Sequence, residues 1–255
     1  MSVAIQVGRL IRSHEAQPER IGQCLLRTFI APGSGSEMIT AARIDIAPCA
    51  TWSQARSPET IGVVFEGRGE VNHGGRFYPL LPGSTFRISD EEAFTLTAYP
   101  GHTLKVYLWT APLPQNWKRA TSPFLVAHLF DATASFRPRL PQDERLAPAR
   151  MNFIHWPGTG SPLLCMHCGI QQPRQTFIVH QHPESEELFI AFRGRGQCFL
   201  NCDWHDMQVG DVLYAPPGHF HGARNPNADG DPFITCGGPT PYDPTLYELA
   251  GISAR

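Results

Sequence analysis

The sequence has no long apolar run and no block of charge of one sign. No stretch approaches the roughly 20 apolar residues that a membrane-spanning helix needs. Residues 1–19 lack the basic cluster followed by an apolar run that marks a signal peptide. Charged residues make up 17% of the chain and the formal net charge is -2, so the composition indicates no basic face for nucleic acid. We therefore expect a cytoplasmic protein that binds neither nucleic acid nor membrane.

The motifs of several common enzyme classes are also missing. Neither Gly-Arg-Gly segment, at 67–69 and 194–196, is followed by Lys-Ser/Thr or by a helical pattern, which argues against a phosphate-binding loop. There is no Gly-x-Ser-x-Gly, so the turn that carries the nucleophile of many serine hydrolases is absent. The Cys-x-x-Cys at 165–168 lies in a strand-like segment, where positions i and i+3 face opposite sides. We therefore do not expect it to bind zinc or to act in redox chemistry.

The sequence holds 7 cysteines, an odd number, so they cannot all pair within the chain. In a reducing cytosol we expect buried thiols rather than disulfides. Cys198 and Cys202 would lie roughly 13 Å apart along one strand, and we expect them to be core or turn thiols.

Turn residues and short apolar runs are abundant. Pro 24 and Gly 23 are high counts for a helical protein and suit short strands joined by tight turns. The apolar runs of the first half are 41–46, 61–65, 77–81, 94–98 and 104–109, and the same pattern returns from residue 151 to 236. We expect an all-β protein of the sandwich or barrel type with a few short helices, one of them at 244–252.

The two halves of the chain repeat one pattern of glycines and apolar residues. Gly67 recurs as Gly194 and Gly83 as Gly210, each 127 residues later and without a gap between them. Glycines at equal spacing mark turns that need a positive φ or a close approach of the backbone. We therefore expect two copies of one β fold. Their expected bounds are 1–125 for the first domain, 126–150 for a Pro-rich connection and 151–255 for the second domain.

Three histidines and a glutamate stand out in the second copy. His180 and His182 are two positions apart, so in a strand their side chains point to one face, roughly 7 Å apart. Glu187 opens the next apolar strand after a polar turn and can return beside them, and His221 follows the turn Pro216-Pro217-Gly218. Imidazole and carboxylate together suit a divalent first-row metal. Six-coordination would leave two positions for water, oxygen or a chelating substrate.

The spacing of these residues resembles the first of the two motifs of the cupin superfamily. That motif has Gly, five residues, His-x-His, three or four residues, Glu, six residues and Gly. This chain has His180, His182, four residues, Glu187, six residues and Gly194. The opening Gly is replaced by Arg174, which affects a turn and leaves the ligand positions intact.

The second cupin motif is complete. It has Gly, five residues, Pro-x-Gly, two residues, His, three residues and Asn. This chain has Gly210, Pro216-Pro217-Gly218, His221 and Asn225 at those intervals. Through the internal repeat the resemblance extends to both halves of the chain. It implies a bicupin, two tandem antiparallel β-barrels of the jelly-roll kind.

The first copy does not carry the metal ligands. The positions 127 residues before the four ligands hold Ser53, Ala55, Thr60 and Phe94. We therefore expect a metal-free, structural N-terminal barrel and one divalent ion per chain in the C-terminal barrel. Iron, manganese, nickel and zinc all remain open as that ion.

Two further residues are candidates for catalysis. His219 has the strand parity of His221, and Tyr214 lies on the strand that enters the Pro-Pro-Gly turn. We assign both as catalytic candidates beside the metal.

The resemblance implies a metal-dependent enzyme that acts on a small, oxygenated, chelating metabolite. Cupins with three His and one Glu include dioxygenases, isomerases, decarboxylases, lyases and hydrolases, and the fold does not choose among them. We favour an Fe(II)- or Mn(II)-dependent oxygenase because the ligand set leaves adjacent positions open. The alternatives are a redox-neutral isomerase, lyase or hydrolase and a cupin that binds a small ligand without turnover. Exposed barrel faces lead us to expect a homodimer.

Overall fold

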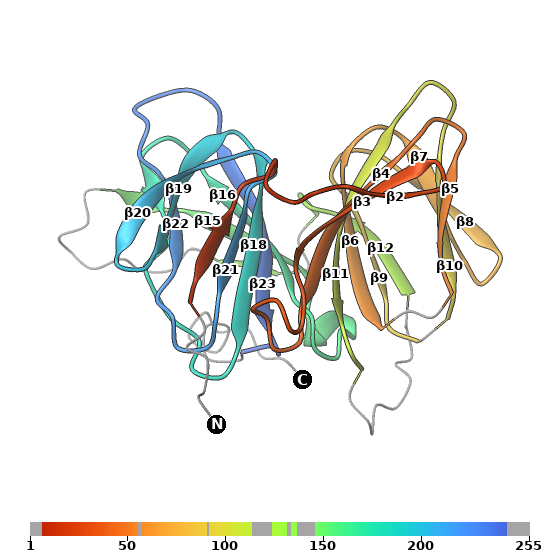
Figure 1. Cartoon of the computed structure of the whole chain (residues 1–255). Helices are drawn as coiled ribbons and strands as arrows, with labels where there is room; N and C mark the ends of the chain where they lie inside the picture. The colour runs from red at the N-terminus through yellow and green to blue at the C-terminus, as the bar shows by residue number, and fades with distance from the viewer. Residues whose placement is uncertain are drawn as a thin grey trace. The chain divides into compact units, whose positions relative to one another are not determined.

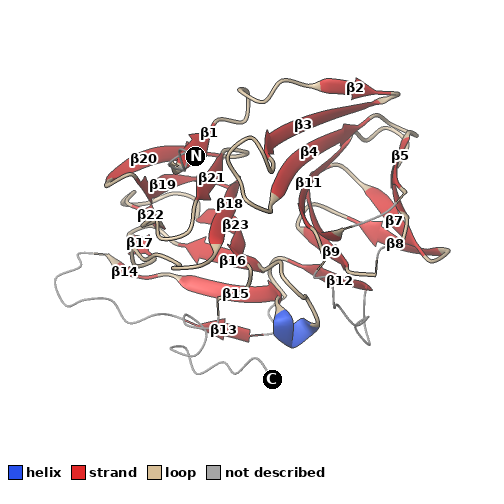
Figure 2. Ribbon diagram, turned by 60° about the horizontal axis from the view of Figure 1, so that its bottom comes forward, coloured by secondary structure: helices blue, strands red, loops and turns tan. Residues whose placement is uncertain are grey.

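The described part of the chain is almost entirely β-structure. The computed structural model describes residues 7–55, 58–90, 92–113, 124–131, 134–136 and 146–243. Within them Figure 2 shows strands, loops and a single helical turn, the 3-10 turn η1 (Pro157–Thr159), and no helix there has the length and apolar character to cross a membrane. The prediction of an all-β chain is confirmed, and the described residues contain one short 3-10 turn. The helix expected at 244–252 lies outside the described residues.

The chain forms two compact units, and neither is a continuous stretch of sequence. We call them the first barrel, Ala16–Asp131 with His155–Leu164, and the second barrel, Met1–Glu15 with Ala132–Ile154 and Cys165–Arg255. The expected domains, 1–125 and 151–255, differ from this division in two segments. Residues 1–15 belong to the second barrel, and residues 155–164 belong to the first barrel. Both segments are short and contact residues far along the chain, so no local pattern in the sequence signals them.

The first barrel is a sandwich of two antiparallel sheets (Figure 1). The larger sheet has the order β12 (Phe124–His128), β9 (Ser84–Ile88), β6 (Glu59–Glu66), β11 (Leu104–Ala111), β4 (Thr40–Ile46), β3 (Cys24–Ile30), β2 (Glu19–Ile21). The smaller sheet has the order β5 (Thr51–Gln54), β10 (Phe94–Ala98), β7 (Gly69–His73), β8 (Arg76–Leu80).

The second barrel also has a larger and a smaller sheet, antiparallel except for the parallel pair β14–β17. Its larger sheet has the order β1 (Arg9–Ile11), β21 (Val212–Ala215), β18 (Glu186–Arg193), β23 (Phe233–Thr240), β16 (Met166–Gln171), β15 (Arg150–His155), β13 (Ala134–Phe136). Its smaller sheet has the order β14 (Ala147–Pro148), β17 (Gln175–Thr176), β22 (Gly222–Asn225), β19 (Arg195–Leu200), β20 (Asp203–Gln208). The edge strand β1 comes from the start of the chain and pairs with β21, with Leu10 opposite Leu213.

The internal repeat predicted from the sequence is confirmed by the strands themselves. Shifted by 127 residues, β6 coincides with β18 at both ends. The turn after each strand holds a glycine with positive φ, 83° at Gly67 and 76° at Gly194. Gly83 and Gly210 both have a φ of 87°. The glycines that recur at equal spacing in the sequence therefore occupy turns of the same backbone conformation.

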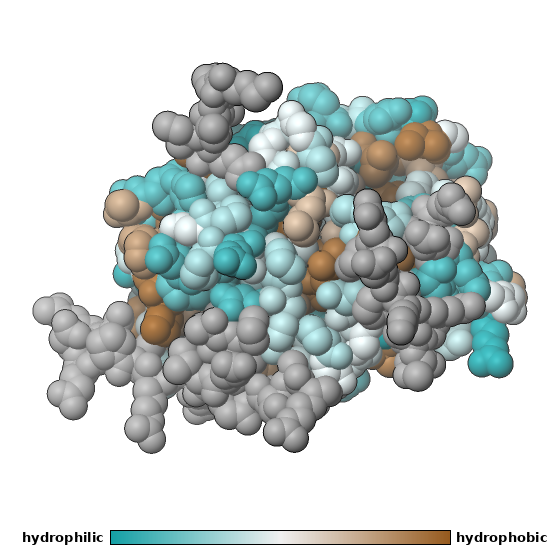
Figure 3. All heavy atoms as spheres, turned by 90° about the horizontal axis from the view of Figure 1, so that it is seen from below, coloured by the Kyte–Doolittle hydropathy of each residue, from teal (hydrophilic) through white to brown (hydrophobic). Residues whose placement is uncertain are grey.

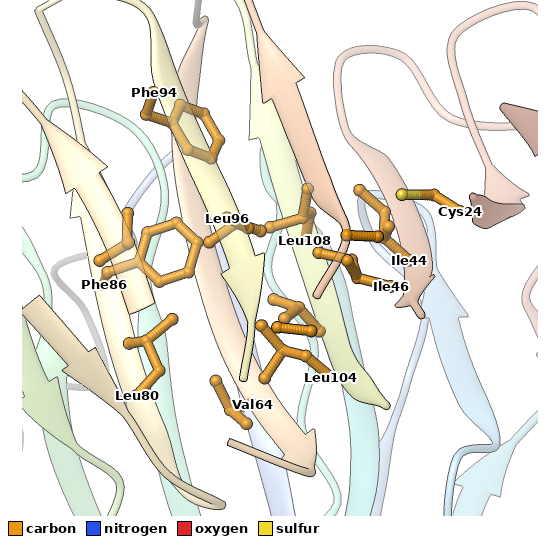
Figure 4. Close-up of a cluster of buried hydrophobic side chains, with 14 of the residues drawn as sticks. Cys24, Ile44, Ile46, Val64, Leu80, Phe86, Phe94, Leu96, Leu104 and Leu108 are labelled. Atoms are coloured by element: carbon orange, nitrogen blue, oxygen red, sulfur yellow. The ribbon is translucent and has the colours of Figure 1, made fainter. Parts of the chain in front are cut away.

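The two sheets of the first barrel enclose one apolar core (Figure 4). Phe94, the residue that replaces a metal ligand, is 1% exposed in this core. Its ring stands edge-to-face against Phe86 at 5.8 Å and Trp52 at 5.7 Å between centroids. Leu96 and Ala98 follow it on the buried face, as the two-residue period of a strand requires. The second barrel has its own core, which includes Phe177, Phe189 and Phe233.

Some large apolar side chains are exposed among the residues that the structure describes. Figure 3 shows a largely hydrophilic face on which hydrophobic residues gather in small groups. The large apolar residues that are exposed are Val7, Ile21, Phe77, Leu81, Phe130, Val209 and Phe220.

The cysteines are all free thiols. Five are buried, and the expectation of buried thiols is wrong for Cys49 and Cys202, which are exposed. These two lie in turns at φ values of 62° and 68°. Cys198 belongs to the core of the second barrel.

One buried carboxylate holds the exchanged segment 155–164 in the first barrel. Glu59 is fully buried, and its Oε2 accepts hydrogen bonds from the N–H groups of Leu163 at 2.8 Å and Leu164 at 3.0 Å. Its Oε1 contacts the Ser161 hydroxyl, which also reaches the Leu164 carbonyl at 2.6 Å. Burial raises the pKa of Glu59 to about 7, against these hydrogen bonds, which lower it. The protonated acid fits the same network, because it can donate to Ser161 while Ser161 donates to Leu164.

We expect Gly194→Ala to destabilise the second barrel more than Gly230→Ala. Both glycines have positive φ, which costs an alanine about 1–2 kcal/mol. A Cβ at Gly194 would lie 2.2 Å from the Pro232 carbonyl oxygen, whereas a Cβ at Gly230 meets nothing within 4 Å. The clash should add about 2 kcal/mol to the loss of unfolding free energy. Urea denaturation measures both variants, and equal losses would contradict this account of the turn.

We expect Glu59→Gln to keep these hydrogen bonds and to remove the pH dependence of stability that the Glu59 carboxyl group causes. The folded-state pKa of Glu59 lies above its ordinary value of 4.5, so the wild type should lose stability as the pH rises from 4.5 to about 7. The glutamine variant should not show this loss. Glu59→Ala leaves two buried N–H groups without an acceptor and should cost about 3 kcal/mol throughout. Urea denaturation at several pH values tests this, and a pH-independent difference between wild type and Glu59→Gln would sink it.

Candidate metal centre

Three histidines converge in the second barrel. His180 and His221 form a β-bridge in which each backbone N–H donates to the other carbonyl, at 2.9 and 2.8 Å. The ring centroids of His180 and His221 are 4.4 Å apart, and those of His180 and His182 are 5.0 Å apart. One ring nitrogen from each of the three lies within 4.8 Å of the others. The strand expected through His180 and His182 is reduced to this single bridge, but both rings still face the same point.

Glu187 completes the group from β18, a strand of the larger sheet. It is the second residue of β18, where it pairs with Ala215 of β21. Its Oε2 lies 3.6 Å from Nε2 of His182. Phe189, two residues further on, lines the same cavity, as the alternation of a strand predicts.

Hydrogen bonds at Nδ1 orient all three rings. Nδ1 of His180 lies 2.9 Å from the Ile178 carbonyl, and Nδ1 of His221 lies 2.9 Å from the carbonyl of His219. Nδ1 of His182 lies 2.7 Å from Oδ2 of Asp243. An acceptor at each Nδ1 places the proton there, so that the lone pair of each Nε2 faces the centre.

The buried atoms that face the centre lack hydrogen-bond partners. They are Nε2 of His182, Nε2 of His221 and Oε2 of Glu187. A buried acceptor without a partner costs about 1–3 kcal/mol, and buried polar atoms in native proteins are nearly always satisfied. Three such atoms around one point fit a divalent metal ion, because imidazole nitrogen and carboxylate oxygen are ligands of first-row metals.

Burial also sets the protonation states of these groups. It lowers the pKa of His180 to about 4 and the pKa of His221 well below its ordinary value. It lowers the pKa of His182 too, against the hydrogen bond and charge of Asp243. For Glu187, burial and then the charge of Asp243 raise the pKa well above its ordinary value. Neutral imidazoles keep their lone pairs available, and an ionised Glu187 is stable there only beside a cation.

The four side chains open onto a small cavity of about 50 Å³. A water needs about 10–15 Å³ of such space, so the cavity admits an ion and a few water-sized groups. Its apolar wall includes Met151, Phe177, Phe189, Ala223 and Pro239. Two polar side chains beyond the candidate ligands also line it, His167 and Thr235.

Sequence reasoning missed His167 and Asp243. His167 lies in β16 opposite Gly237 and is 5% exposed, and burial lowers its pKa to about 3, so it is a neutral imidazole. It lies inside Cys-Met-His-Cys, a pattern whose usual ligands are the thiols. Asp243 lies 61 residues from its partner His182 and belongs to no motif. Only the fold brings either of them to the site.

The two catalytic candidates do not line the cavity. Tyr214 is fully buried on β21 opposite Leu188, which has the opposite strand parity to Glu187. The His219 ring reaches the Pro217 carbonyl at 3.3 Å, and His219 serves the site through its own carbonyl oxygen.

The corresponding positions in the first barrel hold no cluster of ligand side chains. Ser53 and Ala55 are exposed, and Thr60 is buried with its hydroxyl donating to the Pro58 carbonyl at 3.0 Å. Phe94 fills the core, as described above. That the first barrel is metal-free stays a prediction.

A second group of possible ligands lies elsewhere in the first barrel. It consists of His73, Asp90 and Glu92. Nε2 of His73 lies 3.1 Å from the Asp90 carboxylate and 3.8 Å from that of Glu92. The His73 ring stacks on Phe124 at 4.6 Å between centroids. These contacts are those of a histidine–carboxylate pair packed against an aromatic ring.

Comparisons with known proteins agree with this fold. The cupin domain model matches residues 169–231, which contain all four candidate ligands. No curated protein matches the chain by sequence. One similar solved structure is the putative glyoxylate-induced protein from Pseudomonas aeruginosa, with a TM-score of 0.72 and 13% identity over 92% of this chain and 90% of that one.

Two further structures show the same likeness. Protein YlbA from E. coli has a TM-score of 0.70 and 13% identity, covering 93% of each chain. Oxalate decarboxylase from Bacillus subtilis, described with Mn(II) centres, has a TM-score of 0.64 and 11% identity over 95% of this chain and 79% of that one. At identities this low, the structural likeness establishes the fold alone. Residues 169–231 match the cupin domain, and the chain has the fold of two-barrel cupin proteins.

We expect the purified protein to bind one equivalent of divalent metal and His221→Ala to lose it. The substitution removes one of three buried Nε2 atoms that face the centre. His205→Ala is the matched control in the same barrel and should keep the ion, because the His205 ring lies on β20 and contacts the Leu200 carbonyl. Elemental analysis of protein prepared without oxygen measures the content. A second equivalent that disappears in His73→Ala would contradict the metal-free first barrel.

Proposed function

We propose that this protein is a metal-dependent enzyme acting on a small, oxygenated, chelating metabolite. The observation that carries the proposal is the set of buried, unpartnered ligand atoms of His182, His221 and Glu187 around one point. His180 supplies the fourth ligand from the rim of the group. Iron, manganese, nickel and zinc all suit three neutral imidazoles and one carboxylate.

A bound divalent ion would supply Lewis acidity and, if it is iron or manganese, redox chemistry with oxygen. The chain contributes the orientation of the ligands and a cavity that restricts water. The small cavity favours a substrate whose reacting part has only a few heavy atoms beside the ion. The apolar wall of Met151, Phe177 and Phe189 excludes bulk water and strengthens electrostatic interactions within the site.

Two side chains of the cavity wall can orient the substrate. His167 is a neutral imidazole, and Thr235 presents a hydroxyl. Both can donate or accept a hydrogen bond without adding charge. In this proposal they hold the part of the metabolite that does not reach the ion.

Among metal-dependent reactions we favour an Fe(II)- or Mn(II)-dependent oxygenase. Four protein ligands on a six-coordinate ion leave two positions, enough for a substrate oxygen and O₂. The second candidate is a redox-neutral reaction, and the likeness to an oxalate decarboxylase with Mn(II) centres favours it. Within the proposal the first barrel is structural, the protein is cytoplasmic and its assembly is a homodimer.

Oxygen uptake separates these candidates. Iron- or manganese-loaded protein, mixed with a panel of small α-hydroxy and α-keto acids, should consume oxygen with at least one of them. Glu187→Ala should reduce the rate at least 100-fold, since it removes the charged ligand. Glu184→Ala, on the exposed loop before β18, is the matched control and should keep the rate. Formation of product without oxygen uptake would contradict the oxygenase and support the redox-neutral reaction. Binding of these acids without any product would contradict an enzyme of either kind that acts on them.

A further inference from the structure

We propose that Asp243 is a positioning residue of the metal centre that raises its affinity for the ion through His182. This inference rests on the proposed metal-dependent function. Asp243 follows the last strand of the second barrel and is 9% exposed. Its Oδ2 lies 2.7 Å from Nδ1 of His182, a short distance for a hydrogen bond between imidazole and carboxylate.

The partner of His182 differs in kind from those of the other two rings. His180 and His221 each use a backbone carbonyl two residues earlier in the chain, a contact that follows from the local strand conformation. His182 instead uses a carboxylate 61 residues away. A carbonyl only orients a ring, whereas a carboxylate also increases the basicity of the nitrogen on the opposite side.

Orientation and basicity of the ring matter most for His182. It is 1% exposed, and its Nε2 faces Oε2 of Glu187 at 3.6 Å. Without an acceptor at Nδ1, the buried ring could place its proton on Nε2, and that tautomer cannot bind a metal through Nε2. Asp243 therefore selects the tautomer that presents a lone pair beside the Glu187 carboxylate.

The two carboxylates beside His182 also support a role of Asp243 in metal binding. Glu187 and Asp243 lie on either side of the His182 ring, so two carboxylates share one buried region. With neutral histidines, two negative charges balance the charge of a divalent ion. The attraction between the ion and Asp243 acts in a low-dielectric interior and is not removed by solvent screening. Asp243 thus supports binding by charge and by orientation.

Asp243→Asn separates this role from a structural one. The amide oxygen can still accept the hydrogen bond from Nδ1, but the negative charge is gone. We expect dissociation constants for Mn²⁺ and Zn²⁺, measured by competition with a chelating dye, to rise 10- to 100-fold. Asp243→Glu should restore part of the affinity. Asp229→Asn, an exposed aspartate of the same barrel, is the matched control and should bind within twofold of the wild type.

Two further measurements complete the test on the full chain. Imidazole ¹⁵N spectra of metal-free protein should show the Nδ1–H tautomer of His182 in the wild type and a mixture of tautomers in Asp243→Ala. Binding of both ions by Asp243→Asn within twofold of the wild type would overturn the inference, even if that variant melts at a lower temperature. Equally weak binding by the wild type and His221→Ala would instead overturn the metal-dependent function, and this inference with it.

Discussion

The candidate metal centre depends on hydrogen bonds that turn three imidazole rings toward one point. Each Nδ1 has an acceptor, so each Nε2 is left with its lone pair directed inward. The rings are buried and crowded, with centroids of His182 and His221 only 5.2 Å apart. The three rings therefore present their ligand atoms to one place. The mutual backbone bridge of His180 and His221 holds two of the three in register.

The same scaffold occurs twice in the chain, and only one copy brings ligand side chains together at this place. The strands β6 and β18 coincide under the shift, and so do the glycine turns that follow them. What differs is the residue at equivalent places, such as Phe94 in one barrel and His221 in the other. Strand pairing and turn geometry tolerate this exchange because they depend on backbone hydrogen bonds and on the apolar face. A phenylalanine there adds to the core, whereas a histidine leaves a buried nitrogen in need of a partner.

Much of the site could be read from spacing. His180, His182, Glu187 and His221 are brought together as their spacing predicted, because two-residue periodicity and a tight turn act over short distances. Tyr214 shows the limit of that reasoning, since its position near the turn gave no information on which face of β21 it occupies. His167 shows a second limit. Its strand lies beside β23, and nothing near it in the sequence indicates that pairing.

The sequence by itself determined the all-β class, the duplication and the four candidate ligands, because each depends on local periodicity or on turns that only glycine or proline allows. The tertiary structure alone decided which distant segments complete each barrel. Residues 155–164 join the first barrel through Glu59, and Arg9–Ile11 supplies an edge strand to the second. It also brought Asp243 into contact with His182 across 61 residues. Such contacts come from chain segments meeting in space, and their free energy depends on burial and on geometry that no short window of sequence contains.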